Sequence, residues 1–407
     1  MDLLRNRNFL LLTLSRNISR FGDRFTLAAL LILVVQISHG SPIDIALIGA
    51  ASLAPSALLG WFIGPLVDRM ERRTSMLFAD LVRFVAVGAM FFAPNLPTLM
   101  VLAFVANGVW EFYRAAYQAV LPVVVGADDQ LTRAHGLDQS LANGIDVVGY
   151  LLVGLFILIA GVRPAFLIDA ATFLASAVLI RSFSVRIKAP GPKDGPGYLA
   201  ELKAGLAAVS GQPLTRVLLG QIAIACLPIG AFNALLVLLL PDVFHVSATL
   251  YPYLPAVQGI SMVLGGMLMT RYPSAVARRH LINIGLAGTG LITALLGVVP
   301  SFVAALGLYF MMGFFNIAFL VPLLTWYQKS FDSKVRGRAM AIYAAATSLA
   351  LLVATLVAGP LAQAIGVGRT VLLSGLLFMA VGLAGYLTPA TRSQPVQPAK
   401  AEAPQGG

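Results

Sequence analysis

The sequence predicts an all-α membrane protein whose twelve transmembrane helices form two bundles of six. Three observations support this: the composition, the spacing of the apolar runs, and the distribution of Lys and Arg. Of the 407 residues, 58% are hydrophobic and only 11% are charged, and the mean hydropathy is +0.86. Because a soluble domain carries roughly 25% charged residues, this chain has too few polar groups to cover a surface facing water. The composition therefore excludes a soluble globular protein.

The apolar runs between charged, Pro-rich or Gly-rich breaks give the spans in order. A hydrocarbon core about 30 Å thick needs roughly 20 apolar residues per helix, so twelve spans leave only short connections. The first six predicted helices are at 9–36, 45–66, 76–93, 98–121, 138–160 and 164–183. The second six are at 214–240, 251–270, 281–299, 302–326, 338–363 and 369–388. Breaks such as Asn95-Leu96-Pro97 and Pro300-Ser301 divide stretches too long for one span, which favours twelve spans over ten.

The basic residues predict the orientation of these spans. Only Arg163 and Arg369, of 28 Lys and Arg residues, lie in odd-numbered loops, whereas the tails and the even-numbered loops carry most of the others. The positive-inside rule assigns the basic side and both termini of this multi-pass protein to the cytoplasm. The net charge of +11 and the pI near 10 therefore reflect membrane topology, and no nucleic-acid partner is expected.

The first span follows the basic segment Met1 to Arg7 and lacks a small-residue cleavage pattern, so we expect it to be retained. A long interruption rich in Pro and Gly separates the sixth span from the seventh. The predicted organisation is an N-terminal bundle at 1–183, a cytoplasmic linker at 184–213, a C-terminal bundle at 214–388 and a disordered cytoplasmic tail at 389–407. Two six-helix repeats are expected of a transporter that rocks around a site at the bilayer midplane.

The loop after the second span carries a recognisable motif. It reads Gly64-Pro65-Leu66-Val67-Asp68-Arg69-Met70-Glu71-Arg72-Arg73, which resembles the signature loop of the major facilitator superfamily, with Glu71 in place of the usual second glycine. In that pattern a glycine allows close helix packing, an aspartate faces a helix N-terminus, and basic residues stay at the cytoplasmic surface. The resemblance implies a cytoplasmic gate of Gly64, Asp68, Arg69, Arg72 and Arg73, supported by Asp80 and Arg83.

Further segments of the first half are similar to the bacterial enterobactin-exporter and macrolide-efflux branch of this family. They are Arg7-Asn8-Phe9, Ser19-Arg20-Phe21-Gly22-Asp23, Gly40-Ser41-Pro42, Asp80-Leu81-Val82-Arg83, Arg114-Ala115-Ala116-Tyr117-Gln118 with Leu121-Pro122, and Asp169-Ala170. The second half matches mainly in its pattern of spans, and the fifth span has Gly149-Tyr150 where many exporters have Gly-Pro. The resemblance implies a secondary transporter of a bacterial inner membrane that works in the export direction.

Carboxylates inside the spans are the first functional candidates, because inserting a charged group into a membrane costs at least ~2.5 kcal/mol. All of them lie in the first half: Asp23, Asp80, Glu111, Asp138, Asp146 and Asp169. The predicted spans of the second half contain no Asp or Glu. If a buried carboxylate exchanges the coupling proton, the first half must supply it.

Asp23, Glu111 and Asp146 are the proton-coupling candidates, with Arg20, Arg24 and Arg114 as charge partners. Asp23 lies beside Arg24 and three residues after Arg20, so an intrahelical ion pair that lines a polar cavity is an equal alternative. Glu111 and Arg114 are also three residues apart, which predicts a second pair. Asp146 has no basic neighbour in sequence, and its expected partner is Arg114 from another helix.

The remaining acidic residues have structural interpretations. Asp80 and Arg83 are expected to pair with each other near the cytoplasmic end of the third span. Asp138 and Asp169 lie close to span ends, so we expect them to be solvated or to cap a helix.

Amide side chains inside the spans mark the substrate cavity, since an amide in hydrocarbon seeks a partner. The candidates are Asn107, Gln118, Asn143, Gln221, Asn233, Gln258 and Asn316. The four histidines have no metal-ligand spacing, and the single cysteine, Cys226, excludes an internal disulfide. No metal or cofactor is expected, and the expected partners are a small-molecule substrate, a proton and the lipid bilayer, with the chain a monomer.

These observations favour a proton-coupled exporter of a hydrophobic or amphiphilic small molecule such as a drug, a siderophore or a secondary metabolite. A uniporter or importer on the same fold is the alternative, because it shares every architectural feature and differs only in direction and coupling. A polytopic membrane enzyme or a receptor is disfavoured, since the chain has no HExxH, GxSxG or P-loop motif and no soluble domain.

Overall fold

The computed structural model describes residues 3–59, 70–126, 128–183, 213–269, 277–329 and 333–385. This part is all-helical, as predicted, with twelve α-helices. The first six are α1 (Arg7–Ile37), α2 (Pro42–Leu58), α4 (Arg72–Met90), α5 (Leu96–Val125), α6 (Asp128–Ala160) and α7 (Pro164–Arg181). The second six are α9 (Pro213–Asp242), α10 (Tyr253–Met269), α11 (Ala277–Leu296), α12 (Phe302–Lys329), α13 (Ser333–Ile365) and α14 (Val367–Ala384), and two 3-10 helices are at Leu3–Arg5 and Ala248–Leu250.

Seven of these helices are long and apolar enough to cross a membrane, judged by length and composition, and two shorter helices are also apolar. The charged residues inside α1 and α4 lower the hydropathy of those two helices. The predicted linker at 184–213, apart from its last residue, and the predicted tail at 389–407 lie outside the described residues. The domain boundaries at 183 and 214 therefore stay a prediction.

Short polar residues set the starts of several helices. The side chain of Asn6 accepts hydrogen bonds from the backbone N–H groups of Asn8 and Phe9 at the start of α1, at 3.0 and 3.2 Å. Ser41 and Asn95 cap α2 and α5 in the same way. Such caps satisfy backbone donors that a helix leaves unpaired in its first turn. These caps fix where the three helices begin.

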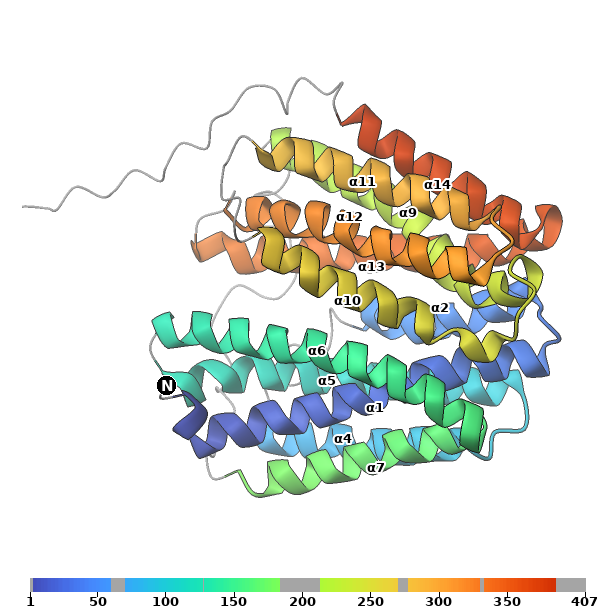
Figure 1. The fold of residues 1–407 in the computed structure, drawn as a ribbon. Coiled ribbons are helices and arrows are strands. Elements are labelled where there is room, and N and C mark those ends of the chain that lie inside the picture. The colour runs from blue at the N-terminus through green and yellow to red at the C-terminus, as the bar shows by residue number, and fades with distance from the viewer. Residues whose placement is uncertain are drawn as a thin grey trace, which may run out of the picture.

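The helices lie side by side along one common direction (Figure 1). Helices α1, α4, α5, α6 and α7 lie together in the lower part of that view, α9 to α14 lie in the upper part, and α2 lies between them and packs on α13. We call the end at which α1 begins the inner end, since the sequence predicts it to be cytoplasmic, and the other end the outer end. Helices α6 and α10 form a second contact between the halves.

The hydrophobic core is arranged differently at the two ends. At the outer end one cluster joins both halves, from residues such as Ile32 of α1 and Val153 of α6 to Leu238 of α9 and Tyr309 of α12. At the inner end the core is divided into one cluster within the first half and another within the second half. A smaller cluster of Ala50 and Ala57 of α2 with Leu352 of α13 also joins the halves. Most of the apolar burial between the halves lies toward the outer end, so the predicted orientation, with a cytoplasmic inner end, predicts an inward-facing conformation.

This conformation predicts which positions react with a thiol reagent. Asn143 of α6 is exposed and lies two residues from the exposed Leu141, on the opposite side of the helix, whereas Thr355 of α13 is buried against α2. In a Cys226→Ser background, we expect Asn143→Cys to react with a membrane-impermeant maleimide at least ~10-fold faster than Thr355→Cys. Equal labelling rates in purified protein would contradict the inward-facing arrangement.

Candidate functional site

An arginine row on α1 forms the centre of the charged network. The guanidinium of Arg20 donates two hydrogen bonds to Asp146 of α6, from Nε to Oδ1 at 2.8 Å and from Nη2 to Oδ2 at 2.6 Å. Arg24 lies one turn further along, with its Nε 3.3 Å from Oδ1 of Asp146, and its Nη1 donates to the hydroxyl of Tyr150 at 3.2 Å. The predicted pairing of Asp146 with Arg114 is therefore wrong. The reason is that residues four apart on α1 share one face, and this face packs on α6.

The close contact between α1 and α6 at this network depends on Gly149. A Cβ atom at this position would lie 2.9 Å from Cγ of Arg24. The absence of a side chain thus makes room for the stem of Arg24 on its way to Asp146 and Tyr150.

Asp23 reaches a different helix from its neighbours on α1. Its carboxylate forms an ion pair with Arg83 of α4, so the predicted intrahelical pairing with Arg20 or Arg24 is wrong. The guanidinium of Arg83 lies over two aromatic rings, with its Cζ 4.0 Å from the ring centre of Phe173 and 5.0 Å from that of Trp110. Both distances lie within the range of cation–π attraction. The rings and Asp23 together fix the position of this buried cation.

Asp80 accepts a hydrogen bond from the hydroxyl of Ser176 of α7 at 2.6 Å and is fully buried. The predicted direct pair between Asp80 and Arg83 is wrong, because Arg83 extends toward Asp23 and the two rings. The second oxygen of Asp80, Oδ1, has no hydrogen-bond partner. A buried carboxylate with an empty acceptor is unusual, since most buried polar groups are paired.

Asp138 and Asp169 are buried, so the prediction that they are solvated or cap a helix is wrong. Helix α6 already begins at Asp128, which places Asp138 almost three turns inside it, where it forms an ion pair with Arg16. Asp169 lies against Gly22, midway along α1, because a Cβ atom there would be 3.0 Å from Cα of Asp169. The side chain of Asp169 accepts a hydrogen bond from Thr172 at 3.2 Å, and its Oδ2 has no partner.

The predicted pair of Glu111 and Arg114 is confirmed. Nε of Arg114 donates to Oε2 of Glu111 at 2.8 Å, and the hydroxyl of Ser56 of α2 donates to Oε1 at 2.5 Å. The carboxylate side chain is only 5% exposed, whereas the Arg114 side chain is 48% exposed. The pair thus combines a buried acid with a cation that remains accessible.

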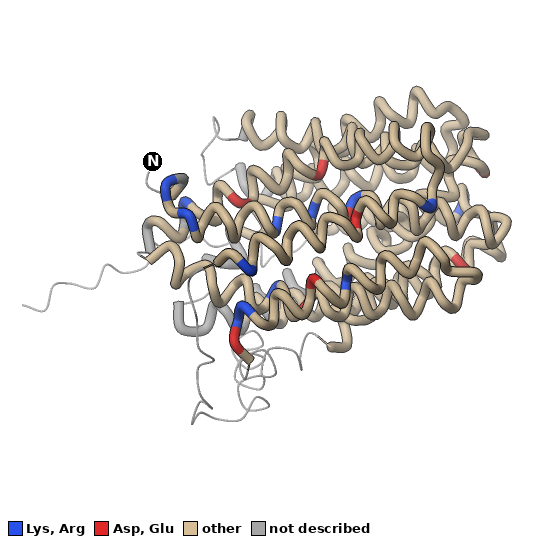
Figure 2. The backbone as a smooth tube through the Cα atoms, turned by 90° about the horizontal axis from the view of Figure 1, so that it is seen from below, with Lys and Arg blue, Asp and Glu red and all other residues tan. Residues whose placement is uncertain are grey.

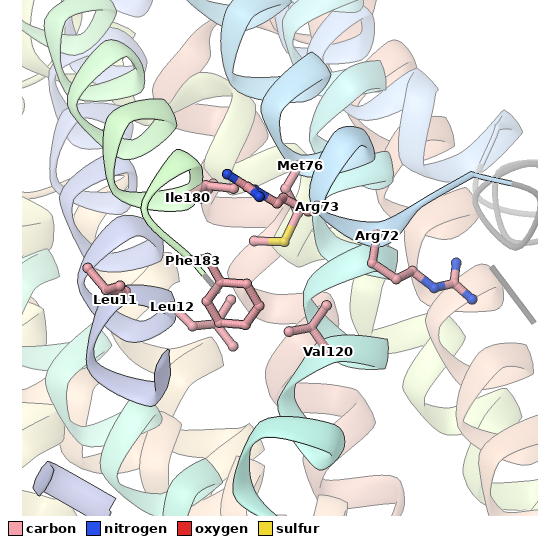
Figure 3. A pocket seen from close by; sticks show the side chains of 8 residues that line it. All are labelled: Leu11, Leu12, Arg72, Arg73, Met76, Val120, Ile180 and Phe183. Atoms are coloured by element: carbon pink, nitrogen blue, oxygen red, sulfur yellow. The ribbon is translucent and has the colours of Figure 1, made fainter. Parts of the chain in front are cut away.

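Of the predicted gate, Gly64, Asp68 and Arg69 lie outside the described residues. Arg72 begins α4 and is buried, and Arg73 donates a hydrogen bond to the backbone carbonyl of Arg181 at the end of α7. Both arginines border a pocket within the first half, together with Leu11, Leu12, Met76, Val120, Ile180 and Phe183, and Arg72 extends away from the other side chains that line it (Figure 3). This pocket is not at the boundary between the halves.

The amide candidates do not form one cluster. Asn107 donates to the carbonyl of Ala103 in its own helix at 2.9 Å, and the exposed Asn143 accepts from Gln139 at 2.9 Å. Gln118 and Asn233 are exposed, Gln258 and Asn316 are partly buried, and Asn316 accepts from Thr289 at 3.5 Å. The side chain of Gln221 lies outside the described part. The structure thus leaves a shared substrate-binding role for these amides as a prediction.

Sequence reasoning missed several members of the network. Arg16 lies over the ring of Tyr117 at 4.5 Å as well as pairing with Asp138. The spacing of Arg16, Arg20 and Arg24, four residues each, could have identified the face of α1 that packs on α6. Ser56, Tyr150 and Ser176 carry no comparable signal, because their partners lie on other helices. Figure 2 shows acidic and basic residues interspersed along the helices of the first half.

Comparisons with known proteins agree with this architecture. A profile described as Major Facilitator Superfamily matches residues 12–354. The chain is 27% identical over 400 residues to an uncharacterized MFS-type transporter, YfiS, of Bacillus subtilis, covering 94% of this chain and 93% of the relative. It is 25% identical to macrolide efflux protein A of Streptococcus pyogenes, covering 84% and 87%. The structure of the nucleoside transporter NupG matches in fold, with a TM-score of 0.76 at 9% identity, over 97% of this chain and 100% of that one.

Proposed function

Because the chain belongs to the major facilitator superfamily, it is a multi-pass secondary transporter and not an enzyme, and we propose that it exports hydrophobic or amphiphilic small molecules in exchange for protons. The observation that carries the proposal is the divided core: the halves share a large hydrophobic cluster at the outer end and a small one between α2 and α13, and each half has a separate cluster toward the inner end. A substrate bound between the halves would leave when they separate at the outer end instead.

The proposed substrate class rests on exposed polar side chains carried by helices of both halves. Asn143 of α6, Gln118 of α5 and Asn233 of α9 are exposed, and these helices also carry many apolar side chains. Arg114, half exposed beside the buried Glu111, adds an accessible cation. A molecule with an apolar body and a few polar groups suits such a surface. The relative named macrolide efflux protein A makes macrolides the first compounds to test.

The proposed coupling uses carboxylates of the first half. Asp146 faces two arginines, Arg20 and Arg24, so we assign it the structural task of holding α1 on α6. Asp23 and Glu111 each face a single arginine. A proton taken up by either acid would release that arginine, and this change in charge would alter the contacts of its helix. We therefore propose Asp23 and Glu111 as the coupling carboxylates.

The loop with Gly64, Asp68 and Arg69 completes the proposal as the gate at the inner end. We expect Asp68→Asn to lower transport without preventing membrane insertion, because it removes the acidic group that would hold the loop closed in the outward-facing state. Transport and the amount of protein in the membrane are measured together. Unchanged transport at equal protein level would count against the gate.

The function is tested by expressing the chain in an efflux-deficient bacterium exposed to macrolides, other antibiotics and siderophores. We expect raised resistance to at least one amphiphilic compound and proton movement when that substrate is added to everted vesicles. Glu111→Gln should lose both effects, because the amide cannot exchange a proton. Asp44→Asn, in the first turn of α2, is the matched control and should retain them. Counterflow without any proton gradient, with Glu111→Gln fully active, would instead indicate a uniporter or importer.

A further inference from the structure

The charged residues in the middle of the first-half helices do not balance. Five arginines lie there, Arg16, Arg20, Arg24, Arg83 and Arg114, against six carboxylates, Asp23, Asp80, Glu111, Asp138, Asp146 and Asp169. The pairs of Arg16 with Asp138 and of Arg114 with Glu111 are each neutral. The group around Asp146 has one arginine in excess. The excess of negative charge is therefore concentrated around Arg83, which faces three carboxylates.

These three carboxylates approach Arg83 from different helices. Asp23 of α1 forms the direct ion pair. Asp80 lies one turn before Arg83 on α4, and Asp169 of α7 lies one turn before Phe173, whose ring covers the guanidinium. Asp80 and Asp169 both interact electrostatically with Asp23 and with Arg83. Since α7 packs on both α1 and α4, the group lies inside the first half and not in the space between the halves.

Asp80 and Asp169 each have one carboxylate oxygen without a hydrogen-bond partner. Asp80 and Asp169 are both fully buried, and neither Oδ1 of Asp80 nor Oδ2 of Asp169 has a partner. Nε and Nη1 of the buried Arg83 also lack a hydrogen-bond acceptor. The titratable and charged groups that face this region are Asp23 with the adjacent Arg24 on α1, Asp80 and Arg83 on α4, Tyr113 on α5 and Asp169 on α7.

We propose that Asp80 and Asp169, which share the neighbourhood of Arg83 with Asp23, form a further proton-binding site beside the coupling candidates Asp23 and Glu111. In the binding step a proton adds to the free oxygen of one carboxylate and gives a neutral carboxyl group, and release reverses this step. One bound proton equalises the numbers of positive and negative groups in the middle of the first half. A metal cation fits less well, because no three His, Cys, Asp or Glu side chains of the described residues lie close enough to hold one.

This site would act on transport through α1, and that part of the inference rests on the proposed proton coupling. With a proton bound, Asp23 has less competition for Arg83, and the ion pair holds α1 on α4. Without it, the additional negative charge beside Arg83 weakens that hold. Because α1 also carries Arg20 and Arg24, which bind Asp146 of α6, a shift of α1 reaches the helix that contacts the second half. Two separate contacts of α1 thus link proton binding to the movement of the halves.

Infrared spectroscopy of the purified full-length chain in detergent tests the site without any substrate. We expect a carbonyl absorption band of a protonated carboxyl group that disappears reversibly as the pH is raised. Asp80→Asn and Asp169→Asn should each remove or shift this band. Asp44→Asn, outside the network, should leave it unchanged. If either network variant fails to fold, Ser176→Ala and Thr172→Val replace them, because each removes a hydroxyl donor of one carboxylate and should shift the band.

Three results would overturn the inference. The first is the absence of a titrating band in the folded wild-type protein. The second is a band that survives all these variants and disappears in Glu111→Gln, which would place the proton at Glu111. The third is loss of the band when sodium chloride is added, with no loss when potassium chloride is added. This result would indicate that the carboxylates bind sodium instead of a proton. A failed resistance assay with a normal band would instead contradict only the proposed substrate or direction.

Discussion

Replacing Asp146 by Asn is expected to destabilise the folded protein by roughly 2–3 kcal/mol. Removing one partner of a buried ion pair typically costs about 3–5 kcal/mol, and we reduce this value because the three side chains are 22–24% exposed. Asn cannot neutralise Arg20 and Arg24, which would then lie one turn apart on the same face of α1 without the carboxylate that holds them. The measurement is unfolding by SDS in mixed micelles, followed by tryptophan fluorescence.

A double variant separates loss of charge balance from loss of packing. Arg20→Met removes one of the two arginines that lose their carboxylate partner, while keeping an unbranched apolar stem. The loss of unfolding free energy in the double variant Asp146→Asn with Arg20→Met should therefore be smaller than the sum of the losses in the two single variants. Asp44→Asn is the control, since Asp44 interacts mainly with the start of its own helix and should cost no more than about 1 kcal/mol. Equal stability of Asp146→Asn and wild type would contradict the structural role assigned to this carboxylate.

The hydrophobic pattern was sufficient to predict the helices, because each span must bury its backbone polar groups within itself and therefore appears as a continuous apolar run. Helix ends were harder to predict. The polar residues from Asp128 to Leu137 continue α6 beyond its apolar run, and hydropathy cannot detect such an extension. As a consequence Asp138 was expected at a span end, although it lies well inside the helix and pairs with Arg16.

Ion-pair partners were predictable only where both members lie on one helix with no competitor nearby. Glu111 and Arg114 met this condition, and the structure pairs them. Asp23 did not, because its neighbours Arg20 and Arg24 bind Asp146 of another helix and leave Asp23 to Arg83. Spacing along a helix gives the face of a side chain, but the partner depends on which helix packs on that face.

The depth of a residue also depends on helix packing. Asp169 lies only five residues after the start of α7, which suggested a solvated position. Helix α7 nevertheless lies against α1 at Gly22, midway along that longer helix. Its position relative to α1 places the carboxylate beside the Asp23–Arg83 pair, where no water-facing surface remains. Sequence distance from a helix end is thus a poor guide to depth when helices of different length pack together.

A disulfide across the outer end is expected to stop transport completely. The two halves approach closely where α2 meets α13, since a Cβ atom at Gly49 would lie 3.1 Å from Cγ2 of Thr355. A sulfur atom in place of that methyl group could bond to a cysteine at position 49 with little backbone movement. In a Cys226→Ser background, Gly49→Cys with Thr355→Cys should therefore form a disulfide on oxidation, and transport in everted vesicles should fall to background.

The reason for this complete loss is that alternating access requires the halves to separate at the outer end, and a covalent bond there keeps them together. Reduction with dithiothreitol should restore transport, which excludes misfolding as the cause. The matched control is Gly88→Cys with Ala170→Cys, which joins α4 to α7 within the first half, where the distance from a Cβ at Gly88 to that of Ala170 is 3.8 Å. This disulfide constrains no movement between the halves, so oxidised protein should remain active. Full transport by the oxidised Gly49–Thr355 pair would show that substrate leaves by a route other than separation of α2 from α13.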